Sequence, residues 1–245
     1  MHQNHDCGIY SADVSPLAAP AVFDAALAQL PLWRREKVDR LRFPEGKRLS
    51  LGAGLLLNMA LAQHHVDALS ATVETSPLGK PFLPDYPDIH FNLSHSENRV
   101  LCVISDLRCG CDVERLGRGS FRLARRFYAE EEQERLTAAD EQTAPAEWQA
   151  LFARIWTRKE SYLKADGRGF SVPPASFSVF SQPSEVVFLE SDAAQGYHQS
   201  VCLLNPDGRP PRWQAYTVQF HLSAGRPVLS CLEDPSFILS GDGSV

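Results

Sequence analysis

Two acidic side chains in the middle of the chain could bind a metal ion. In Gly110-Cys111-Asp112-Val113-Glu114, the two-residue period of a β-strand places Asp112 and Glu114 on one face and turns Cys111 and Val113 into the core. Neighbouring carboxylates repel each other unless a cation lies between them, and oxygen ligands suit Mg²⁺ bound together with substrate phosphates. The pattern predicts a magnesium-phosphate site, but a solvent-facing strand with two incidental acids would have the same pattern.

More charged residues follow Trp148, where the apolar positions 148, 151, 152, 155, 156 and 163 form one helical stripe. At about 100° per residue, Glu160 and Lys164 lie together at the edge of this stripe, one turn apart. They could be catalytic groups or an exposed ion pair. Lys159 lies near the centre of the stripe, where an unpaired charge is costly, so it needs an anionic partner or a route to the surface.

Basic residues are concentrated between positions 34 and 48, just before the apolar, helix-like run 49–62. This patch could bind a polyanion, although a solvated helix face has the same composition. Within the run, Gly52-Ala53-Gly54 lacks the third glycine of a dinucleotide-binding loop, so we expect these glycines to serve helix packing. The basic residues of the patch are Arg34, Arg35, Lys37, Arg40, Arg42, Lys47 and Arg48.

Transfer of a phosphoryl group would use all of these features. It needs a metal ion to neutralise the pyrophosphate, cations to stabilise the leaving phosphate, and a base for the attacking hydroxyl. His95, at the end of a half-buried strand predicted over 89–95, adds a titratable group beside Asn92 and Ser94. The residues that could supply these parts are Asp112, Glu114, Glu160, Lys159, Lys164 and His95.

The elements that must position these residues indicate a mixed α/β protein. Consecutive antiparallel strands are predicted at 89–95, 100–104 and 109–114, and helices over 121–136 and 145–164. Later strands are predicted at 177–180, 186–189, 215–221 and 227–232. We expect two α/β halves, residues 1–108 and residues 109–235 with the metal site, followed by a polar tail over 236–245.

Composition excludes several functional classes. The chain has 245 residues, of which 44% are hydrophobic, and its net charge of −6 argues against a nucleic-acid partner. No apolar run reaches the roughly 20 residues of a membrane helix, and no signal-peptide pattern is present, so we expect a cytoplasmic protein with no membrane partner. The six cysteines are expected to be buried thiols, and neither Cys109-x-Cys111 nor the cluster His2, His5, Asp6 and Cys7 predicts a zinc site.

Three signatures resemble, in order, those of the 4′-phosphopantetheinyl transferases of the type that activates surfactin synthetase. The first is Gly79-Lys80-Pro81 with Phe91-Asn92-Leu93-Ser94-His95-Ser96, and the second is Gly110-Cys111-Asp112-Val113-Glu114. The third and most specific is Trp156-Thr157-Arg158-Lys159-Glu160-Ser161-Tyr162-Leu163-Lys164, extended by Gly167-Arg168-Gly169-Phe170-Ser171.

The resemblance implies a pseudo-twofold monomer of two similar α/β halves with coenzyme A in the cleft between them. It implies that Asp112, Glu114 and Glu160 hold Mg²⁺, which Mn²⁺ could replace, with the pyrophosphate of coenzyme A. The residues expected at coenzyme A phosphates are Lys80, Ser94, His95, Lys159 and Lys164, with Arg34, Lys37 and Arg48 in the basic patch.

In the implied reaction, a serine of an apo acyl or peptidyl carrier protein attacks the β-phosphate. Glu160, directly or through a metal-bound water, takes the serine proton, and Lys164 stabilises or protonates departing 3′,5′-ADP; His95 completes the expected catalytic set. Glu132 is left out of the site, because three adjacent glutamates make its alignment ambiguous. The hypothesis for docking the carrier rests on the basic cluster Arg118, Arg122, Arg125 and Arg126.

Two other functions remain open. A metal-dependent nucleotide pyrophosphate hydrolase would use the same acids and lysines with water in place of serine. A non-catalytic module that binds coenzyme A or a carrier protein would keep the fold without the chemistry, and the complete set Asp112, Glu114, Glu160 and Lys164 argues against it. Fatty acid, polyketide, nonribosomal peptide and siderophore systems all present such a serine, so the residues do not select among them.

Overall fold

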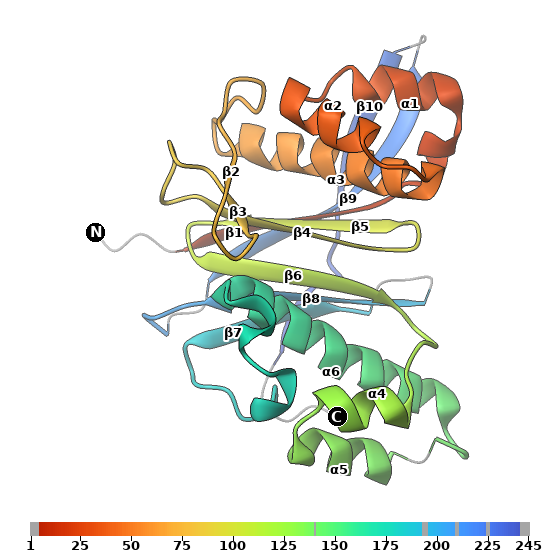
Figure 1. The fold of residues 1–245 in the computed structure, drawn as a ribbon, viewed down its shortest axis with the longest axis vertical. Helices are drawn as coiled ribbons and strands as arrows, with labels where there is room; N and C mark the ends of the chain where they lie inside the picture. The colour runs from red at the N-terminus through yellow and green to blue at the C-terminus, as the bar shows by residue number, and fades with distance from the viewer. Residues whose placement is uncertain (1–4, 140, 193–195, 209–210, 224–225, 241–245) are drawn as a thin grey trace.

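The computed structural model describes residues 5–139, 141–192, 196–208, 211–223 and 226–240, and it has the expected mixed α/β fold (Figure 1). Two sheets lie face to face, and a layer of helices covers the outer side of each. No helix within these ranges is long and apolar enough to cross a membrane.

The first sheet has the strand order β10-β9-β1-β5-β4, with β1 parallel to β9 and antiparallel to β5. Helices α1 (Pro20–Leu27), α2 (Leu32–Asp39) and α3 (Pro44–Gln63) cover it. The strands are β1 (Asp6–Asp13), β4 (His90–Ser96), β5 (Arg99–Ser105), β9 (Arg212–Ser223) and β10 (Arg226–Glu233).

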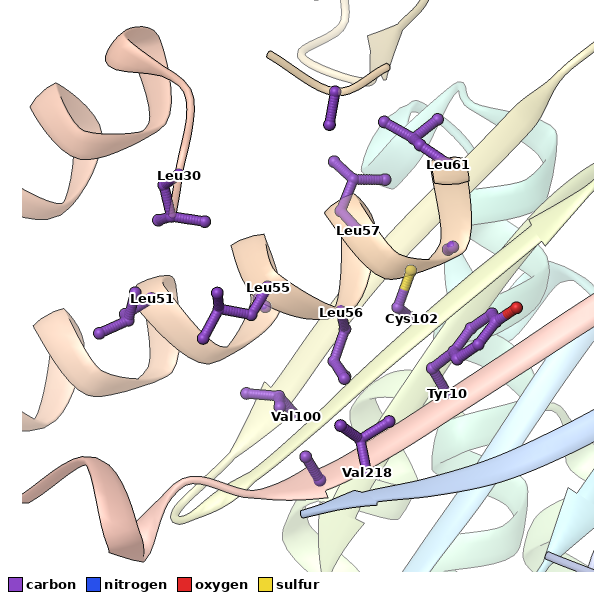
Figure 2. Packing of buried hydrophobic residues seen from close by; sticks show 14 of the residues in the cluster. Tyr10, Leu30, Leu51, Leu55, Leu56, Leu57, Leu61, Val100, Cys102 and Val218 are labelled. Carbon is purple, nitrogen blue, oxygen red and sulfur yellow. The ribbon is translucent and has the colours of Figure 1, made fainter. Parts of the chain in front are cut away.

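Helix α3 packs directly on this sheet. Pro44 occupies its first turn, where a missing N–H costs nothing, and leucine and alanine favour the helix that follows. Its buried side chains, such as Leu56, lie against Val100 and Cys102 of β5 (Figure 2). A Cβ on Gly52 would lie 2.4 Å from a methyl of Val14, so this glycine permits close packing, as predicted.

The second sheet has the order β11-β7-β8-β6 and is covered by the long helix α6 (Pro145–Asp166). Helix α6 begins with Pro145 and ends at Gly167, whose φ of 81° closes the helix in the left-handed conformation that glycine adopts without strain. The strands are β6 (Arg108–Arg115), β7 (Val186–Ser191), β8 (Tyr197–Leu204) and β11 (Ile238–Leu239). Strands β2 (Glu74–Thr75) and β3 (Pro81–Phe82) form a separate two-stranded sheet, in which β3 contacts β4.

Strand β6 alternates as the sequence predicts. Cys111 and Val113 are fully buried among residues of the first sheet, whereas Gly110 faces α6. A Cβ on Gly110 would lie 2.2 Å from the carbonyl oxygen of Ser161, so the helix rests on the strand backbone at this point. Asp112 and Glu114 share the face of Gly110 and are thereby brought beside α6.

The helix predicted over 121–136 is two helices, α4 (Phe121–Phe127) and α5 (Glu130–Ala138). Tyr128 is extended between them because its ring is buried and its hydroxyl donates to the carbonyl of Phe152 at 2.7 Å. The strand predicted over 177–180 is also wrong. Its backbone bonds to side chains instead of a neighbouring strand, since Val179 N donates to Glu132 at 2.8 Å and the carbonyl of Phe177 accepts from Lys159 at 2.6 Å.

Three features of the predicted organisation differ from the structure. Strand β6 does not pair with β5 but opens the second sheet against β8. Strands β9 and β10 return to the first sheet, so the segment 109–235 does not form one continuous half. The expected tail is anchored, because Phe237 is buried and β11 pairs with β7, while residues 241–245 lie outside the described ranges.

Five cysteines are buried thiols as expected, whereas Cys231 is exposed. Its strand, β10, is an edge strand of the first sheet, where one flank lacks a neighbouring strand. All six cysteines are free.

Candidate active site

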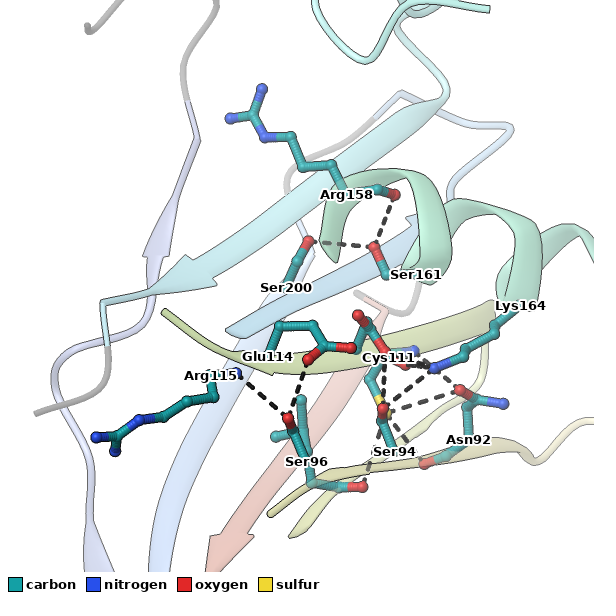
Figure 3. Close-up of polar contacts among 12 residues, drawn as sticks. Asn92, Ser94, Ser96, Cys111, Glu114, Arg115, Arg158, Ser161, Lys164 and Ser200 are labelled. Carbon is teal, nitrogen blue, oxygen red and sulfur yellow. Dashed lines mark hydrogen bonds and ion pairs between the residues drawn. The ribbon is translucent and has the colours of Figure 1, made fainter. Parts of the chain in front are cut away.

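The two sheets meet along β4 and β6, where side chains of β4 bind to β6. Asn92 Oδ1 accepts from the backbone N–H of Cys111 at 3.0 Å, Ser94 Oγ donates to Asp112 Oδ1 at 2.8 Å, and Ser96 Oγ donates to Glu114 Oε2 at 2.9 Å (Figure 3). These three polar residues alternate along β4 and so share one face. We call this line of contacts the seam; both acids predicted from the sequence lie on it.

Lys164 of α6 reaches into the seam. Its Nζ lies 2.6 Å from Asp112 Oδ1 and 3.1 Å from both Ser94 Oγ and the carbonyl oxygen of Cys111 (Figure 3). Burial lowers the pKa of Lys164, but the charge and hydrogen bond of Asp112, together with the charges of Cys111 and Glu160, outweigh it and leave the pKa above its ordinary value. Lys164 is therefore held as a cation.

Asp112 has one oxygen in this network and one outside it. The residue is 4% exposed, and its Oδ2 is buried without a hydrogen-bond partner in the described part of the chain. Buried polar atoms are nearly always paired, so this oxygen is available to a ligand.

Glu114 and Glu160 complete an acidic group around Asp112. Burial raises the pKa of each, and the charge of Asp112 raises it further. Among the described residues, no group of three or more His, Cys, Asp and Glu side chains is arranged to hold a metal ion by itself. Mg²⁺ takes one or two carboxylates and completes its shell with phosphate oxygens and water, and Oδ2 of Asp112, which has no partner among the described residues, fits such a shell.

A cleft opens beside these acids. It is lined by the turn Gly79-Lys80-Pro81, by Asn92 of β4, and by Glu160 and Lys164 of α6. Residues from the first and third sequence signatures, far apart in the chain, therefore line one cavity.

Arg34, on α2, is a buried cation without a carboxylate partner among the described residues. It is 5% exposed, its Nη2 donates to the carbonyl of Ser50 at 3.0 Å, and its Nε has no partner. Burial lowers the pKa of Arg34 to about 10. Three further atoms are buried and find no hydrogen-bond partner in the described part of the chain: Nε of Arg48, Nε1 of Trp33 and Oγ of Ser50. These donors lie on α2 and the start of α3, and an anion would satisfy them.

The positive charge of Arg34 acts on both His95 and Lys37. His95 is exposed, and the pKa of its imidazole is lowered by desolvation and then by the charges of Lys164 and Arg34. The pKa of Lys37 is likewise lowered, by partial burial and by Arg34. His95 thus lies within the field of both the seam and the buried basic residues.

Comparison with known proteins identifies the family of this chain. Residues 108–220 match the 4′-phosphopantetheinyl transferase superfamily. The chain is 33% identical over 187 residues to 4′-phosphopantetheinyl transferase Sfp of Bacillus subtilis strain 168, which covers 71% of this chain and 82% of that protein. The chain belongs to the 4′-phosphopantetheinyl transferase superfamily.

Two other relatives differ in how much of the chain they match. The 4′-phosphopantetheinyl transferase HetI of a Nostoc species is 36% identical over 143 residues, which cover 55% of this chain and 58% of that protein. The human L-aminoadipate-semialdehyde dehydrogenase-phosphopantetheinyl transferase is 24% identical over 253 residues, or 83% of this chain and 80% of that protein. The matched range 108–220 begins at β6, so this part of the phosphopantetheinyl transferase includes Asp112, Glu114, Glu160 and Lys164.

Lys159, predicted to contact phosphate, is engaged elsewhere in this phosphopantetheinyl transferase. It is 2% exposed, and its Nζ lies 2.7 Å from Glu132 Oε2, 2.7 Å from the carbonyl oxygen of Pro174 and 2.6 Å from that of Phe177. The anionic partner that the sequence required for Lys159 is therefore Glu132. With three donors used, Lys159 has none left for phosphate, and we do not include it in the site.

Lys80 is engaged in a similar way. Its Nζ donates to the carbonyl oxygens of Cys109, Lys164 and Ala165 at 2.9, 2.6 and 3.2 Å. Its side chain lines the cleft, but its ammonium group points to backbone, which does not support the predicted contact with phosphate.

Several residues that shape the site were not identified from the sequence. Asn92 and Ser96 bind β6, and the alternation of polar residues at 92, 94 and 96 was the signal that could have identified them. Next to Glu160, Ser161 Oγ lies 3.1 Å from Ser200 Oγ of β8 (Figure 3). No signal for that contact was available, because β8 was not predicted.

Proposed function

We propose that this protein transfers 4′-phosphopantetheine from coenzyme A to a serine hydroxyl of an apo carrier protein and requires Mg²⁺ to do so. The products are the holo carrier protein and 3′,5′-ADP. The observation that carries the proposal is that Lys164 pairs with one oxygen of Asp112, while the other oxygen is buried and has no partner among the described residues. A cation for a leaving phosphate and an oxygen for a metal ion are thus adjacent. The names of the relatives support the substrate class.

Asp112, Glu114 and Glu160 are the residues that would hold the metal ion. When bound, Mg²⁺ would neutralise charge on the pyrophosphate of coenzyme A, as in other phosphoryl transfers. The pKa values of Glu114 and Glu160 are raised first by burial and then by the charge of Asp112, and this supports the proposal, because a cation would stabilise the charged form of both groups.

The buried basic residues would bind the end of coenzyme A that carries the 3′-phosphate. Arg34 and Arg48 each have a buried, unpaired Nε, and Lys37 lies close enough to Arg34 for the charge of Arg34 to lower its pKa. A phosphate group accepts several hydrogen bonds and compensates clustered positive charge. His95, whose pKa responds to the charges of both Lys164 and Arg34, and Ser94, which binds Asp112, would contact the phosphates nearer the reaction centre.

Glu160 would act as the base. Because its pKa is raised, its carboxylate is a stronger proton acceptor than an ordinary glutamate. It would take the proton of the serine hydroxyl while the serine oxygen bonds to the β-phosphorus. The bond from that phosphorus to the oxygen bridging the α-phosphate breaks, and 3′,5′-ADP leaves with the bonding electrons. Lys164, held protonated by Asp112, would stabilise that oxygen.

Helix α4 would dock the carrier protein. Arg122 and Arg125 are exposed and make no ion pair within the described ranges, whereas Arg118 is bound to Glu97 at 2.7 Å. An apolar cavity lined in part by Leu123 lies beside α4 and reaches Glu114. Exposed cations around an apolar hollow suit a small acidic helical domain.

Charge reversal tests this docking surface. Arg122→Glu with Arg125→Glu should raise the KM for the carrier protein at least tenfold, by repelling its acidic surface, and leave the KM for coenzyme A unchanged. Arg40→Glu, at an exposed position directly after α2, is the matched control. An unchanged carrier KM in the double variant would rule out α4 as the docking element.

We also propose that the protein acts as a monomer in the cytoplasm. The free state of all six cysteines supports a reducing compartment, and every residue proposed for the site comes from one chain. Light scattering coupled to size-exclusion chromatography would test the monomer, and a stable dimer would contradict it.

Release of 3′,5′-ADP from coenzyme A distinguishes transfer from hydrolysis. We expect release only when an apo carrier protein is present, and no release with a carrier whose serine is replaced by alanine. Equal release without any carrier protein would instead support the nucleotide pyrophosphate hydrolase.

A further inference from the structure

The ammonium group of Lys80 binds backbone carbonyls where the end of α6 meets β6. It donates to the carbonyl oxygens of Cys109, Lys164 and Ala165 at 2.9, 2.6 and 3.2 Å. An ammonium group has three donors, so all of them are used. Burial lowers the pKa of Lys80, and within the described chain no ion pair with a carboxylate offsets that cost. The carbonyl oxygens provide the compensation.

Two of these carbonyls belong to the last turn of α6, which ends at Asp166. The last four carbonyls of a helix have no partner inside the helix, and the negative end of the helix dipole favours a cation there. The third carbonyl, from Cys109, belongs to β6. One ammonium group therefore joins the end of α6 to the strand that carries Asp112.

The surrounding backbone leaves little room for a different arrangement. A Cβ on Gly110 would lie 2.3 Å from the backbone nitrogen of Ala165, so the end of α6 rests directly on β6. A Cβ on Gly167 would lie 3.5 Å from Cδ of Lys80, so the stem of Lys80 packs over the residue that ends the helix. Backbone contact at Gly110 limits how closely α6 approaches β6. The three bonds of Lys80 hold the last turn of α6 beside Cys109 of β6.

Lys164 is consequently held at both ends. Its carbonyl oxygen accepts from Lys80 at 2.6 Å, and its own Nζ lies 2.6 Å from Asp112. A shift of the last helical turn would move the backbone of Lys164 and draw its ammonium group away from Asp112. Glu160, one turn earlier on the same helix, would move with it.

We infer that Lys80 is a positioning residue and not a phosphate ligand: by binding the last turn of α6 to β6, it keeps Lys164 and Glu160 in place for the reaction. This inference rests on the proposed function, because it assigns Lys80 a role in the same transfer. It predicts a loss in turnover with little loss in coenzyme A binding, whereas a phosphate ligand would show the opposite.

The test is Lys80→Met, which keeps the packing of the stem and removes the donors. We expect kcat to fall about 10- to 100-fold, while the Kd for coenzyme A, measured by calorimetry, changes less than threefold. Arg135→Met, which removes a half-buried cation on α5 that pairs with Glu131 and does not line the cleft, is the matched control and should leave both quantities unchanged. A tenfold rise in the Kd with unchanged kcat, or no change in either, would overturn the inference.

Amide hydrogen exchange provides a readout that does not depend on activity. In Lys80→Met without coenzyme A, the amides of residues 163–167 should exchange at least tenfold faster, while those of α3 stay as in the parent protein. Unchanged exchange at 163–167 would contradict the inference. If the parent protein failed to transfer phosphopantetheine, the proposed function would be wrong. The exchange result would still test whether Lys80 holds the last turn of α6 on β6. Lys80→Gln, which retains amide donors, replaces the methionine variant if that variant does not fold.

Discussion

The ammonium group of Lys164 lies 2.6 Å from Oδ1 of Asp112, while Oδ2 of the same carboxylate is buried without a partner in the described chain. One carboxylate can therefore fix the cation that would stabilise a leaving phosphate and also offer an oxygen to a metal ion. Ser94, which binds the paired oxygen, keeps the carboxylate from rotating. The geometry of Asp112 therefore supports both the role proposed for Lys164 and the proposed metal ion.

Asp112→Ala and Glu160→Gln should each lower kcat/KM at least about 100-fold, because each removes a carboxylate proposed to hold the metal ion or accept the proton. Both variants should stay folded, since the side chain of Lys164 is 28% exposed and can turn to water when Asp112 is absent. Steady-state kinetics with circular dichroism would measure both effects. Near-normal turnover in either variant would refute the assignment of the site.

Arg34→Met should weaken the binding of coenzyme A at least tenfold, because it removes a buried cation proposed to contact the 3′-phosphate. The affinity for dephospho-coenzyme A, which lacks that phosphate, should be nearly the same in the variant and the parent. Arg40→Met, an exposed residue paired with Glu36 on the same stretch of chain, should change neither affinity. Equal losses for both ligands would place Arg34 away from the 3′-phosphate.

Lys159→Met should lower the free energy of unfolding by about 3–5 kcal/mol, because it leaves the fully buried carboxylate of Glu132 and two carbonyls without their donor. Adding Glu132→Gln should restore part of that loss, since the buried charge is then gone. Urea unfolding would measure both. A folded Lys159→Met variant whose KM for coenzyme A rises tenfold would show that Lys159 does contact phosphate.

The metal-binding strand could be predicted from the sequence because its evidence is local. Alternation along 110–114 is enough to place Asp112 and Glu114 on one face, and the helical stripe is enough to show that Lys159 needs a partner. The partner itself, Glu132, could not be chosen among three adjacent glutamates, because only packing of α5 against α6 buries one of them. Helix α6 was predicted within two residues because Pro145 and Gly167 mark its ends.

The orientation of Lys80 could not be predicted, because it depends on contacts between residues 84 positions apart. Its neighbours Gly79 and Pro81 indicate only a turn. Strands β1 and β8 were missed for a related reason: they are identified by the strands they pair with, not by a regular alternation of their own. The return of β9 to the first sheet likewise follows from its parallel pairing with β1, which has no local signal, and β10 joins that sheet by antiparallel pairing with β9.

Acid should destabilise the protein through Glu190. Burial alone would raise the pKa of Glu190, but the two hydrogen bonds from Arg158, both 2.7 Å, lower it to about 2. Because the folded-state pKa lies below the ordinary value of 4.5, the stabilisation is complete above that pH and is lost as the pH falls toward 2. Its size is about 3 kcal/mol.

Urea unfolding at several pH values between 5 and 3 would test the contribution of Glu190. As the pH falls, the free energy of unfolding should decrease less in Glu190→Gln than in the parent. The variant should also be less stable at pH 7, since Arg158 is then buried without its partner. Glu36→Gln, at an exposed acid, should follow the pH dependence of the parent. Parallel curves for the parent and Glu190→Gln would contradict the role of this ion pair.

Intact-protein mass spectrometry tests the central claim most directly. An apo carrier protein incubated with this protein, coenzyme A and Mg²⁺ should gain the mass of one phosphopantetheine group, and EDTA should prevent the gain. The same incubation with Asp112→Ala should leave the carrier in its apo form. No gain across acyl and peptidyl carrier proteins, with coenzyme A still bound to the protein, would contradict the transferase account and favour a module that binds coenzyme A without chemistry.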